Sequence, residues 1–185
     1  MKHSLTLILG GARSGKSTHA LSLAQAYGGR VLYIATAAAG DEEMAERIAT
    51  HKSERPPDWV TLEVQQEIGA AVRKLEAHYE AVILDCMTLL VSNLLFSVPE
   101  PLSESAVWER IDKELDGILE AVKSTRAAWL VVSNEVGLGL VPENKLGRLY
   151  RDLLGRANQR LAQAADEVIL MVAGVPLTVK KQTGE

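Results

Sequence analysis

Several residue types are scarce in this chain of 185 residues. It has one cysteine, Cys86, and aromatic residues make up only 4% of it. A single cysteine excludes an internal disulfide, offers no thiolate pair for zinc and fits a reducing compartment. Apolar runs such as Ala127 to Val132 are far shorter than a membrane span, and the five mostly apolar residues between Ser4 and Gly10 are too few for a secretory signal. We therefore expect a cytoplasmic protein with no transmembrane segment.

An excess of positive charge is also lacking. Twenty Lys and Arg residues stand against 24 Asp and Glu residues, which gives a net charge of −4 and an isoelectric point near 5.6. The chain has no general basic character, so neither nucleic acid nor an anionic membrane is an expected partner, and any anion must bind at a local basic cluster. At this length we expect one domain, residues 1–185, that buries roughly 70% of the surface of its unfolded chain.

What the chain does have, at residues 5–18, is a glycine-rich loop between an apolar run and a helical pattern, LTLILGGARSGKST. Gly10, Gly15, Lys16 and Ser17 satisfy the P-loop spacing G-x-x-x-x-G-K-[ST], and the apolar run supplies the strand that must precede it. Such glycines let consecutive backbone N–H groups turn toward a phosphate, and the start of the next helix adds its positive dipole end. We expect Lys16 to reach the outer phosphates of a nucleoside triphosphate and Ser17 to hold Mg²⁺.

Buried strands and amphipathic helices alternate after the P-loop. A helix over Ser17 to Ala26 stops at Gly28-Gly29, and Val31 to Ile34 is typical of a buried second strand. This order begins a parallel sheet, whose ligands bind beyond the carboxyl ends of the strands, so we expect Thr36 to face the same crevice as the P-loop. The predicted fold is α/β, a mostly parallel sheet flanked by helices and closed by a C-terminal strand pair at 168–172 and 175–179.

A carboxylate ends another apolar strand, Ala81 to Asp85. The pattern is that of a Walker B strand, in which Asp85 would orient Mg²⁺ directly or through water. A strand can also end in Asp for capping reasons alone, but the P-loop in the same chain favours the functional interpretation.

Three more helices are expected, over Gln66 to Tyr79, Trp108 to Val122 and Glu143 to Ala165. The last of them carries four arginines on its predicted outer side, Arg148, Arg151, Arg156 and Arg160. These arginines are either solvated or include one that reaches the phosphates of a neighbouring subunit. The glycine-containing loop at 134–142 either closes over a large substrate or is a flexible connection.

His51 is the histidine with the most informative neighbours. It lies at the end of a predicted helix over Asp41 to Lys52, beside Arg47, Lys52 and Arg55. Such a cluster would hold anionic phosphate next to an imidazole nucleophile. An ordinary histidine at a helix end explains the same residues, and the residues alone leave both interpretations open.

Four segments together resemble the bifunctional adenosylcobinamide kinase / adenosylcobinamide-phosphate guanylyltransferase family of cobalamin biosynthesis. They are GGARSGKS at 10–17, YIATA at 33–37, DEEMAERIATHKSERPPDWVTLE at 41–63 and NEVGLGLVPENKLGRLYRDLLGRANQRLA at 134–162. A P-loop is shared by many families, whereas the string around His51 and the Asn-Glu-Val-Gly loop are specific to this one. The resemblance implies a RecA-like fold and a homotrimer.

The resemblance also implies two reactions. ATP or GTP donates its γ-phosphoryl group to the hydroxyl of the aminopropanol arm of adenosylcobinamide. A histidine then attacks the α-phosphate of GTP, expels pyrophosphate and passes GMP to adenosylcobinamide phosphate, which gives adenosylcobinamide-GDP. His51 matches that histidine. The positions that match nucleotide-binding residues of the family are Gly10, Gly11, Ala12, Arg13, Ser14, Gly15, Lys16, Ser17, Ile34, Ala35, Thr36, Lys52, Ser53, Glu54, Arg55, Glu63 and Asp85.

Two alternatives to this function are another small-molecule P-loop kinase and a regulatory GTP-binding protein whose loop at 136–141 binds a partner. One geometric question also arises within the favoured function. A P-loop presents the γ-phosphate, whereas His51 must reach the α-phosphate. Either the nucleotide shifts between the two steps or the helix that carries His51 moves.

Overall fold

The computed structural model describes residues 4–38, 40 and 42–182, without the side chains of residues 43, 44 and 47. Asp41, the predicted start of a helix, and the side chain of Arg47 therefore lie outside the described residues. The strands are β1 (Ser4–Gly10), β2 (Val31–Ala35), β3 (Val60–Glu63), β4 (Ala81–Asp85), β5 (Ala128–Val132), β6 (Glu167–Val172) and β7 (Val175–Lys181). The helices are α1 (Lys16–Tyr27), α2 (Glu42–Ser53), α3 (Ile68–Arg73), α4 (Met87–Phe96), α5 (Glu104–Ser124) and α6 (Lys145–Ala164).

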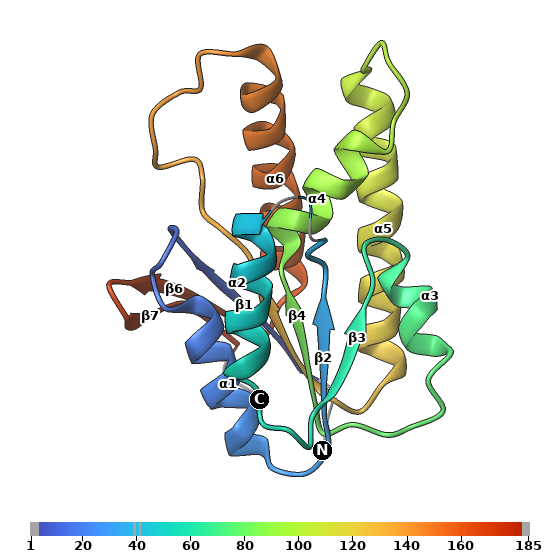
Figure 1. The fold of residues 1–185 in the computed structure, drawn as a ribbon, viewed down its shortest axis with the longest axis vertical. Helices are drawn as coiled ribbons and strands as arrows, with labels where there is room; N and C mark the ends of the chain where they lie inside the picture. Colours follow the sequence, from blue (N-terminus) through green and yellow to red (C-terminus); the bar gives the residue numbers. More distant parts are fainter. Residues whose placement is uncertain (1–3, 39, 41, 183–185) are drawn as a thin grey trace.

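The strands form one seven-stranded sheet in the order β3-β2-β4-β5-β1-β6-β7 (Figure 1). Strands β1 to β6 pair in parallel, and only β7 runs antiparallel, along the outer edge of β6. The predicted mostly parallel sheet and its C-terminal strand pair are therefore confirmed. Because β6 also pairs with β1, only β7 of that pair is an edge strand.

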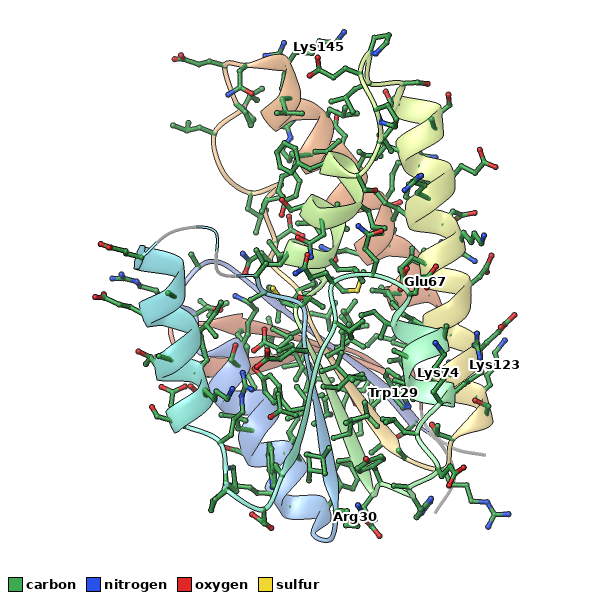
Figure 2. All side chains as sticks on the ribbon, turned by 45° about the vertical axis from the view of Figure 1, so that its right-hand side comes forward. Arg30, Glu67, Lys74, Lys123, Trp129 and Lys145 are labelled. Carbon is green, nitrogen blue, oxygen red and sulfur yellow. The ribbon has the colours of Figure 1, made fainter. Side chains whose placement is uncertain are left out.

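Alternating side chains of the strands build a core on each face of the sheet. Leu5 and Leu7 of β1, with Trp129 of β5, pack in the larger core together with helices α3 to α6. Ile8 of β1 and Leu130 of β5 point the other way and pack with α1. Trp129, labelled in Figure 2, is fully buried beside the sheet. Because helices cover both faces of the sheet, its interior strands are nearly continuous runs of apolar residues and do not alternate between apolar and polar residues.

Helix α3 is shorter than the predicted helix over Gln66 to Tyr79, which is wrong beyond Arg73. The buried carboxylate of Glu114, on α5, accepts hydrogen bonds from the backbone N–H groups of Glu67 and Ile68, at 2.8 and 2.7 Å, and fixes where α3 begins. The end of α3 closes with bonds to the third preceding residue, such as Leu75 N–H to the Val72 carbonyl. A tertiary contact and a tight last turn thus decide its length.

Helix α5 is longer than predicted, because Ser103 caps it by accepting a hydrogen bond from the backbone N–H of Ala106 at 3.5 Å. The helix therefore begins at Glu104 and not at the predicted Trp108. No helix in the described part of the chain combines the length and apolar character needed to cross a bilayer.

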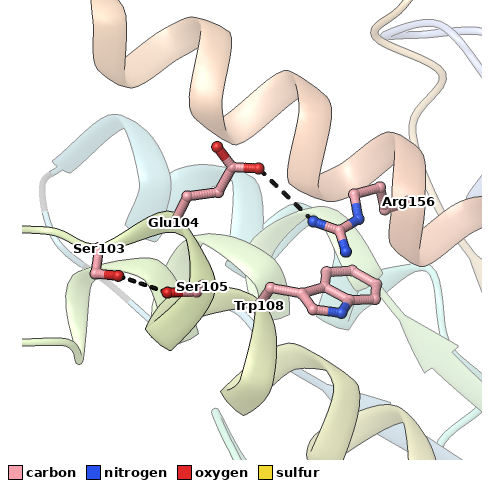
Figure 3. A pocket seen from close by; sticks show the side chains of 5 residues that line it. All are labelled: Ser103, Glu104, Ser105, Trp108 and Arg156. Atoms are coloured by element: carbon pink, nitrogen blue, oxygen red, sulfur yellow. Dashed lines mark hydrogen bonds and ion pairs between the residues drawn. The ribbon is translucent and has the colours of Figure 1, made fainter.

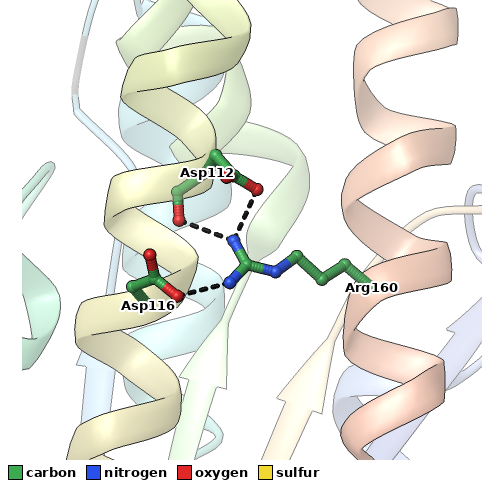
Figure 4. Close-up of polar contacts among 3 residues, drawn as sticks. All are labelled: Asp112, Asp116 and Arg160. Carbon is green, nitrogen blue, oxygen red and sulfur yellow. Dashed lines mark hydrogen bonds and ion pairs between the residues drawn. The ribbon is translucent and has the colours of Figure 1, made fainter.

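Two of the four arginines of α6 contact the neighbouring helix α5. Arg160 reaches across to α5, where it bonds the carboxylates of Asp112, at 2.5 Å, and Asp116 (Figure 4). Arg156 lies over the ring of Trp108, 3.9 Å from its centroid, and pairs with Glu104 (Figure 3). These two arginines therefore join α6 to α5.

Candidate nucleotide-binding site

The P-loop follows β1 in the interior of the sheet and leads directly into α1. Gly15 adopts a left-handed conformation, with φ of 91°, just before the helix begins, and no described side chain caps that helix end. A Cβ on Gly10 would lie 2.5 Å from Ser14 Oγ and 2.6 Å from the Met171 carbonyl oxygen, so the loop needs glycine there. The buried Ser14 hydroxyl has no hydrogen-bond partner among the described residues. The loop thus offers uncapped N–H groups and an unpaired hydroxyl to an anion.

Lys16 is the one buried lysine of the described chain, with 8% of its surface exposed. Its ammonium donates a hydrogen bond to the Gly11 carbonyl at 2.6 Å, across the mouth of the P-loop. Burial lowers the pKa of Lys16, and the nearby acidic groups Cys86 and Asp85 act in the opposite direction. A partly desolvated cation held across an anion-binding loop is arranged to bind phosphate.

Asp85 ends β4, as the sequence predicted, and its carboxylate lies close enough to influence Lys16. The Tyr33 hydroxyl donates a hydrogen bond to Asp85 Oδ2 at 2.6 Å. Burial and this carboxylate raise the pKa of Tyr33, so the phenol stays protonated and remains the donor. Burial also raises the pKa of the Cys86 thiol to about 11, so Cys86 is a neutral thiol at physiological pH. The sequence did not indicate Tyr33 as a site residue, because it lies in a strand, β2, whose other residues are all apolar.

The residues around His51 come from the end of α2 and from the strands beside it. His51 Nδ1 lies 3.6 Å from Glu54 Oε2, and 42% of the imidazole side chain is exposed. Lys52 pairs with Glu63, at the end of β3, at 3.1 Å. The Arg55 guanidinium lies over the Tyr33 ring, 3.6 Å from its centroid. Through Arg55, Tyr33 and Asp85, a chain of contacts joins the end of the His51 helix to the P-loop side of the sheet.

The predicted site residues are not all brought to one place. Thr36 is where the sequence placed it, beyond β2, and its hydroxyl exchanges hydrogen bonds with the backbone of Cys86, at 2.8 and 2.9 Å. The side chain of Ile34 lies in the apolar core and not at the strand ends. The pair Lys52 and Glu63 lies at β3, three strands from β5 and four from β1 in the sheet order.

Helix α2 carries His51 in its last turn. It connects the parallel strands β2 and β3 and runs opposite to them (Figure 1), and Lys52, next to His51, reaches Glu63 at the carboxyl end of β3. The described side chains of α2 are exposed or only half-buried. Lys52 at its end and Arg55 just beyond it contact Glu63 of β3 and Tyr33 of β2.

The segment after β5, for which the sequence predicts a loop that closes over a large substrate or a flexible connection, begins beside the P-loop. The Glu135 backbone N–H donates to the Gly10 carbonyl at 3.0 Å. Asn158, buried on α6, donates to the Asn134 carbonyl at 3.0 Å and accepts from the Ser133 hydroxyl at 2.7 Å. Thr88 accepts from the Asn134 N–H at 3.0 Å. These bonds join residues 133–135 to the P-loop through Gly10, to α4 through Thr88 and to α6 through Asn158.

The sheet order and the P-loop at the end of β1 define a P-loop nucleotide-binding protein with a RecA-like fold. The RadB recombinase shares this fold, with a TM-score of 0.52 and 14% identity over 91% of this chain and 74% of that one. Residues 6–179 match the family described as cobinamide kinase / cobinamide phosphate guanyltransferase (CobU), and the chain belongs to this family.

Relatives from three bacteria match almost the whole chain. The bifunctional adenosylcobalamin biosynthesis protein CobU of Salmonella typhimurium is 44% identical over 95% of this chain and 99% of its own length. CobU of Escherichia coli is 41% identical over the same shares, and the bifunctional protein CobP of Pseudomonas aeruginosa is 42% identical over 94% and 96%.

Proposed function

We propose that this chain catalyses both reactions of its family in cobalamin biosynthesis. ATP or GTP phosphorylates adenosylcobinamide, and GTP then supplies GMP to adenosylcobinamide phosphate, which yields adenosylcobinamide-GDP and pyrophosphate. The observation that carries the proposal is the family match over residues 6–179, because it includes the P-loop and the His51 helix in one chain. The small-molecule kinase and the regulatory GTP-binding protein remain alternatives that the relatives do not favour.

In the kinase step the P-loop binds the triphosphate. The uncapped start of α1 and the loop residues at 10–17 hold the β- and γ-phosphates, and Lys16 neutralises charge as the γ-phosphoryl group leaves. Thr36, beyond the end of β2, borders the same crevice. The partial burial of Lys16 strengthens its attraction to phosphate, because less water screens the two charges.

Ser17 and Asp85 fit a Mg²⁺ bound together with the nucleotide. One side-chain hydroxyl, one carboxylate and phosphate oxygens are the usual ligand set for Mg²⁺ at a P-loop. No cluster of three His, Cys, Asp or Glu side chains that could hold a metal alone occurs among the described residues, so the phosphates would complete the site. Mg²⁺ would supply charge neutralisation on the transferred phosphoryl group. Tyr33 would orient Asp85 for this role through their hydrogen bond.

In the guanylyl step we assign the nucleophile to His51. Its imidazole forms a bond to the α-phosphorus of GTP while the bond to the pyrophosphate oxygen breaks, and the guanylylated histidine then passes GMP to the acceptor. Lys52 and Arg55, the next cations along the chain, would bind the phosphates, and Glu63 would recognise the guanine or the ribose. For this step the α-phosphate and the imidazole must meet, by a shift of the nucleotide or of α2.

The test is covalent labelling with Mg²⁺ and GTP labelled at the α-phosphate. We expect an acid-labile, base-stable adduct on the wild type and on His78→Ala, a control at an exposed histidine, and none on His51→Ala. His51→Ala should also lose guanylyl transfer and keep part of its phosphoryl transfer. No adduct on folded, phosphoryl-transferring wild type would favour a plain P-loop kinase, and equal loss of both activities in His51→Ala would contradict the role of His51 as nucleophile.

Two further expectations come from the resemblance and the composition. We propose that the chain assembles as a homotrimer, for which sedimentation equilibrium should give three times the chain mass of 20.1 kDa. A cytoplasmic location remains a prediction from the single cysteine.

A further inference from the structure

The kinase step, as proposed above, needs an acceptor for the proton of the substrate hydroxyl. Carboxylates at the carboxyl edge of the sheet are the candidates. Asp85 already accepts from Tyr33 and lies beside Lys16, which suits it to a metal-orienting role. Glu63 is paired with Lys52 and lies four strands from β1. Glu135 is the carboxylate whose position and contacts leave it available.

Glu135 follows β5, at the point in the sheet where the connections of two neighbouring strands diverge. Strand β1 leads to β2 through α1, which covers one face of the sheet. Its neighbour β5 leads to β6 through α6, which covers the opposite face. In open parallel sheets this is where ligands bind. The hydrogen bond from the Glu135 N–H to the Gly10 carbonyl extends the pairing of β5 with β1 up to the first residue of the P-loop.

The carboxylate of Glu135 is held in a defined orientation. Its Oε1 accepts a hydrogen bond from the Gly137 N–H at 2.6 Å, and no described residue bonds its Oε2. A Cβ on residue 137 would lie 2.8 Å from Oε1, so glycine is needed for this contact. One carboxylate oxygen is thus fixed by the backbone while the other can accept a proton.

Glu135 also lines a cavity of about 460 Å³ next to the P-loop strand. Its walls include Leu9 at the end of β1, Gly137, and Arg151, Asn158 and Gln159 on α6. The charged groups that share the cavity with Glu135 are Arg151, Asp152 and Arg156. A mixed lining of amides, charges and small residues suits a hydroxyl-bearing arm that carries amide groups more than it suits an apolar ring.

We propose that this cavity receives the hydroxyl-bearing arm of the acceptor and that Glu135 is the general base of phosphoryl transfer. Glu135 Oε2 takes the hydroxyl proton as the hydroxyl oxygen forms its bond to the γ-phosphorus. The bond between the γ-phosphorus and the β–γ bridging oxygen breaks, and the nucleoside diphosphate leaves with that oxygen. The protonated Glu135 then returns its proton to water.

The experiment compares Glu135→Gln with wild type in transfer of γ-labelled phosphate from ATP to adenosylcobinamide. General base catalysis contributes about 10²–10⁴-fold, so kcat should fall by that factor while the KM for adenosylcobinamide changes little. In the wild type, kcat should fall toward low pH because the base becomes protonated, and this acidic limb of the pH–rate profile should be absent in Glu135→Gln. Guanylylation of His51 by α-labelled GTP should persist, since that step removes no hydroxyl proton. Glu143→Gln, which removes an exposed carboxylate outside the cavity, is the charge-matched control and should keep wild-type kcat.

Each other outcome is decisive. A fully active Glu135→Gln, a loss confined to KM, or an unchanged acidic limb overturns the assignment. If Glu135→Gln does not fold, Glu135→Asp keeps a carboxylate and should retain the acidic limb with reduced kcat, and an Asp variant without that limb overturns it as well. Wild type that transfers no phosphate to adenosylcobinamide would instead contradict the proposed function itself.

Discussion

Lys16 must be a cation beside phosphate, yet the fold removes much of the water around it. Its ammonium keeps one backbone hydrogen bond, to Gly11, and burial lowers its pKa below the ordinary 10.5. A buried charge that makes few contacts weakens the folded state while it prepares the site for an anion. Function and stability therefore oppose one another at this residue.

We expect Lys16→Met to abolish nucleotide binding while leaving the nucleotide-free protein at least as stable as the wild type at pH 7. The lowered pKa means that the unfolded chain binds the proton more tightly, so wild-type stability should rise as pH increases from the folded pKa toward 10.5. The variant should lose that contribution. Urea unfolding between pH 7 and 10.5, with nucleotide titration, measures both effects. A large loss of stability in Lys16→Met at pH 7 would show that the ammonium holds the loop together.

Helices α3 and α5 contact each other at Gly69 and Gly117, where the absence of side chains lets the two backbones approach closely. A Cβ on Gly69 would lie 2.1 Å from the Gly117 carbonyl oxygen, a distance that flexible side chains cannot relieve because both sides are backbone. The same pair of helices is joined by the Glu114 carboxylate at the start of α3. The packing of α3 therefore depends on a small residue at one position and a buried acid at another.

We expect Gly69→Ala to destabilise the protein by about 1–3 kcal/mol or more, since overpacking must move a helix. Gly155→Ala is the matched control, because a Cβ there meets nothing within 4 Å. At that helical position alanine should stabilise the protein by up to about 1 kcal/mol through helix propensity. Chemical denaturation of both variants measures the difference. Equal effects of the two substitutions would contradict the close approach of α3 and α5.

At the scale of the whole molecule, one sheet supports both cores, and each core draws on strands from both halves of the chain. Strand β1, from the start of the sequence, lies between β5 and β6 from its end. Neither half can bury its strands without the other. We therefore propose that residues 1–185 unfold as one cooperative unit.

Calorimetry should show a single transition whose calorimetric and van't Hoff enthalpies agree when the chain is monomeric. If the proposed trimer is required for stability, Tm should instead rise with protein concentration.

Mg²⁺ and GTP at about 100 times Kd should add about 2.7 kcal/mol of stability to the wild type and nothing to Lys16→Met. Two separate transitions, only one of them raised by nucleotide, would contradict a single unit.

The sequence by itself determined the P-loop, the parallel sheet, the strand ending at Asp85 and the family. These features depend on spacing within short windows: glycines that let a loop turn, apolar runs that need two covered faces, and helices that stop at glycine. Lys16 and Ser17 therefore begin the helix that follows the P-loop, and Thr36 directly follows β2, as the sequence predicts.

Only the tertiary structure decided which distant residues meet. Glu114 sets the start of α3, Arg156 and Arg160 join α6 to α5, and Tyr33 lies between Arg55 and Asp85. Glu135 comes beside Gly10 because β5 pairs with β1, although 125 positions separate the two residues in the sequence. Strand order arises from packing of the whole chain, and no local pattern specifies it, so contacts between strand ends had to be observed.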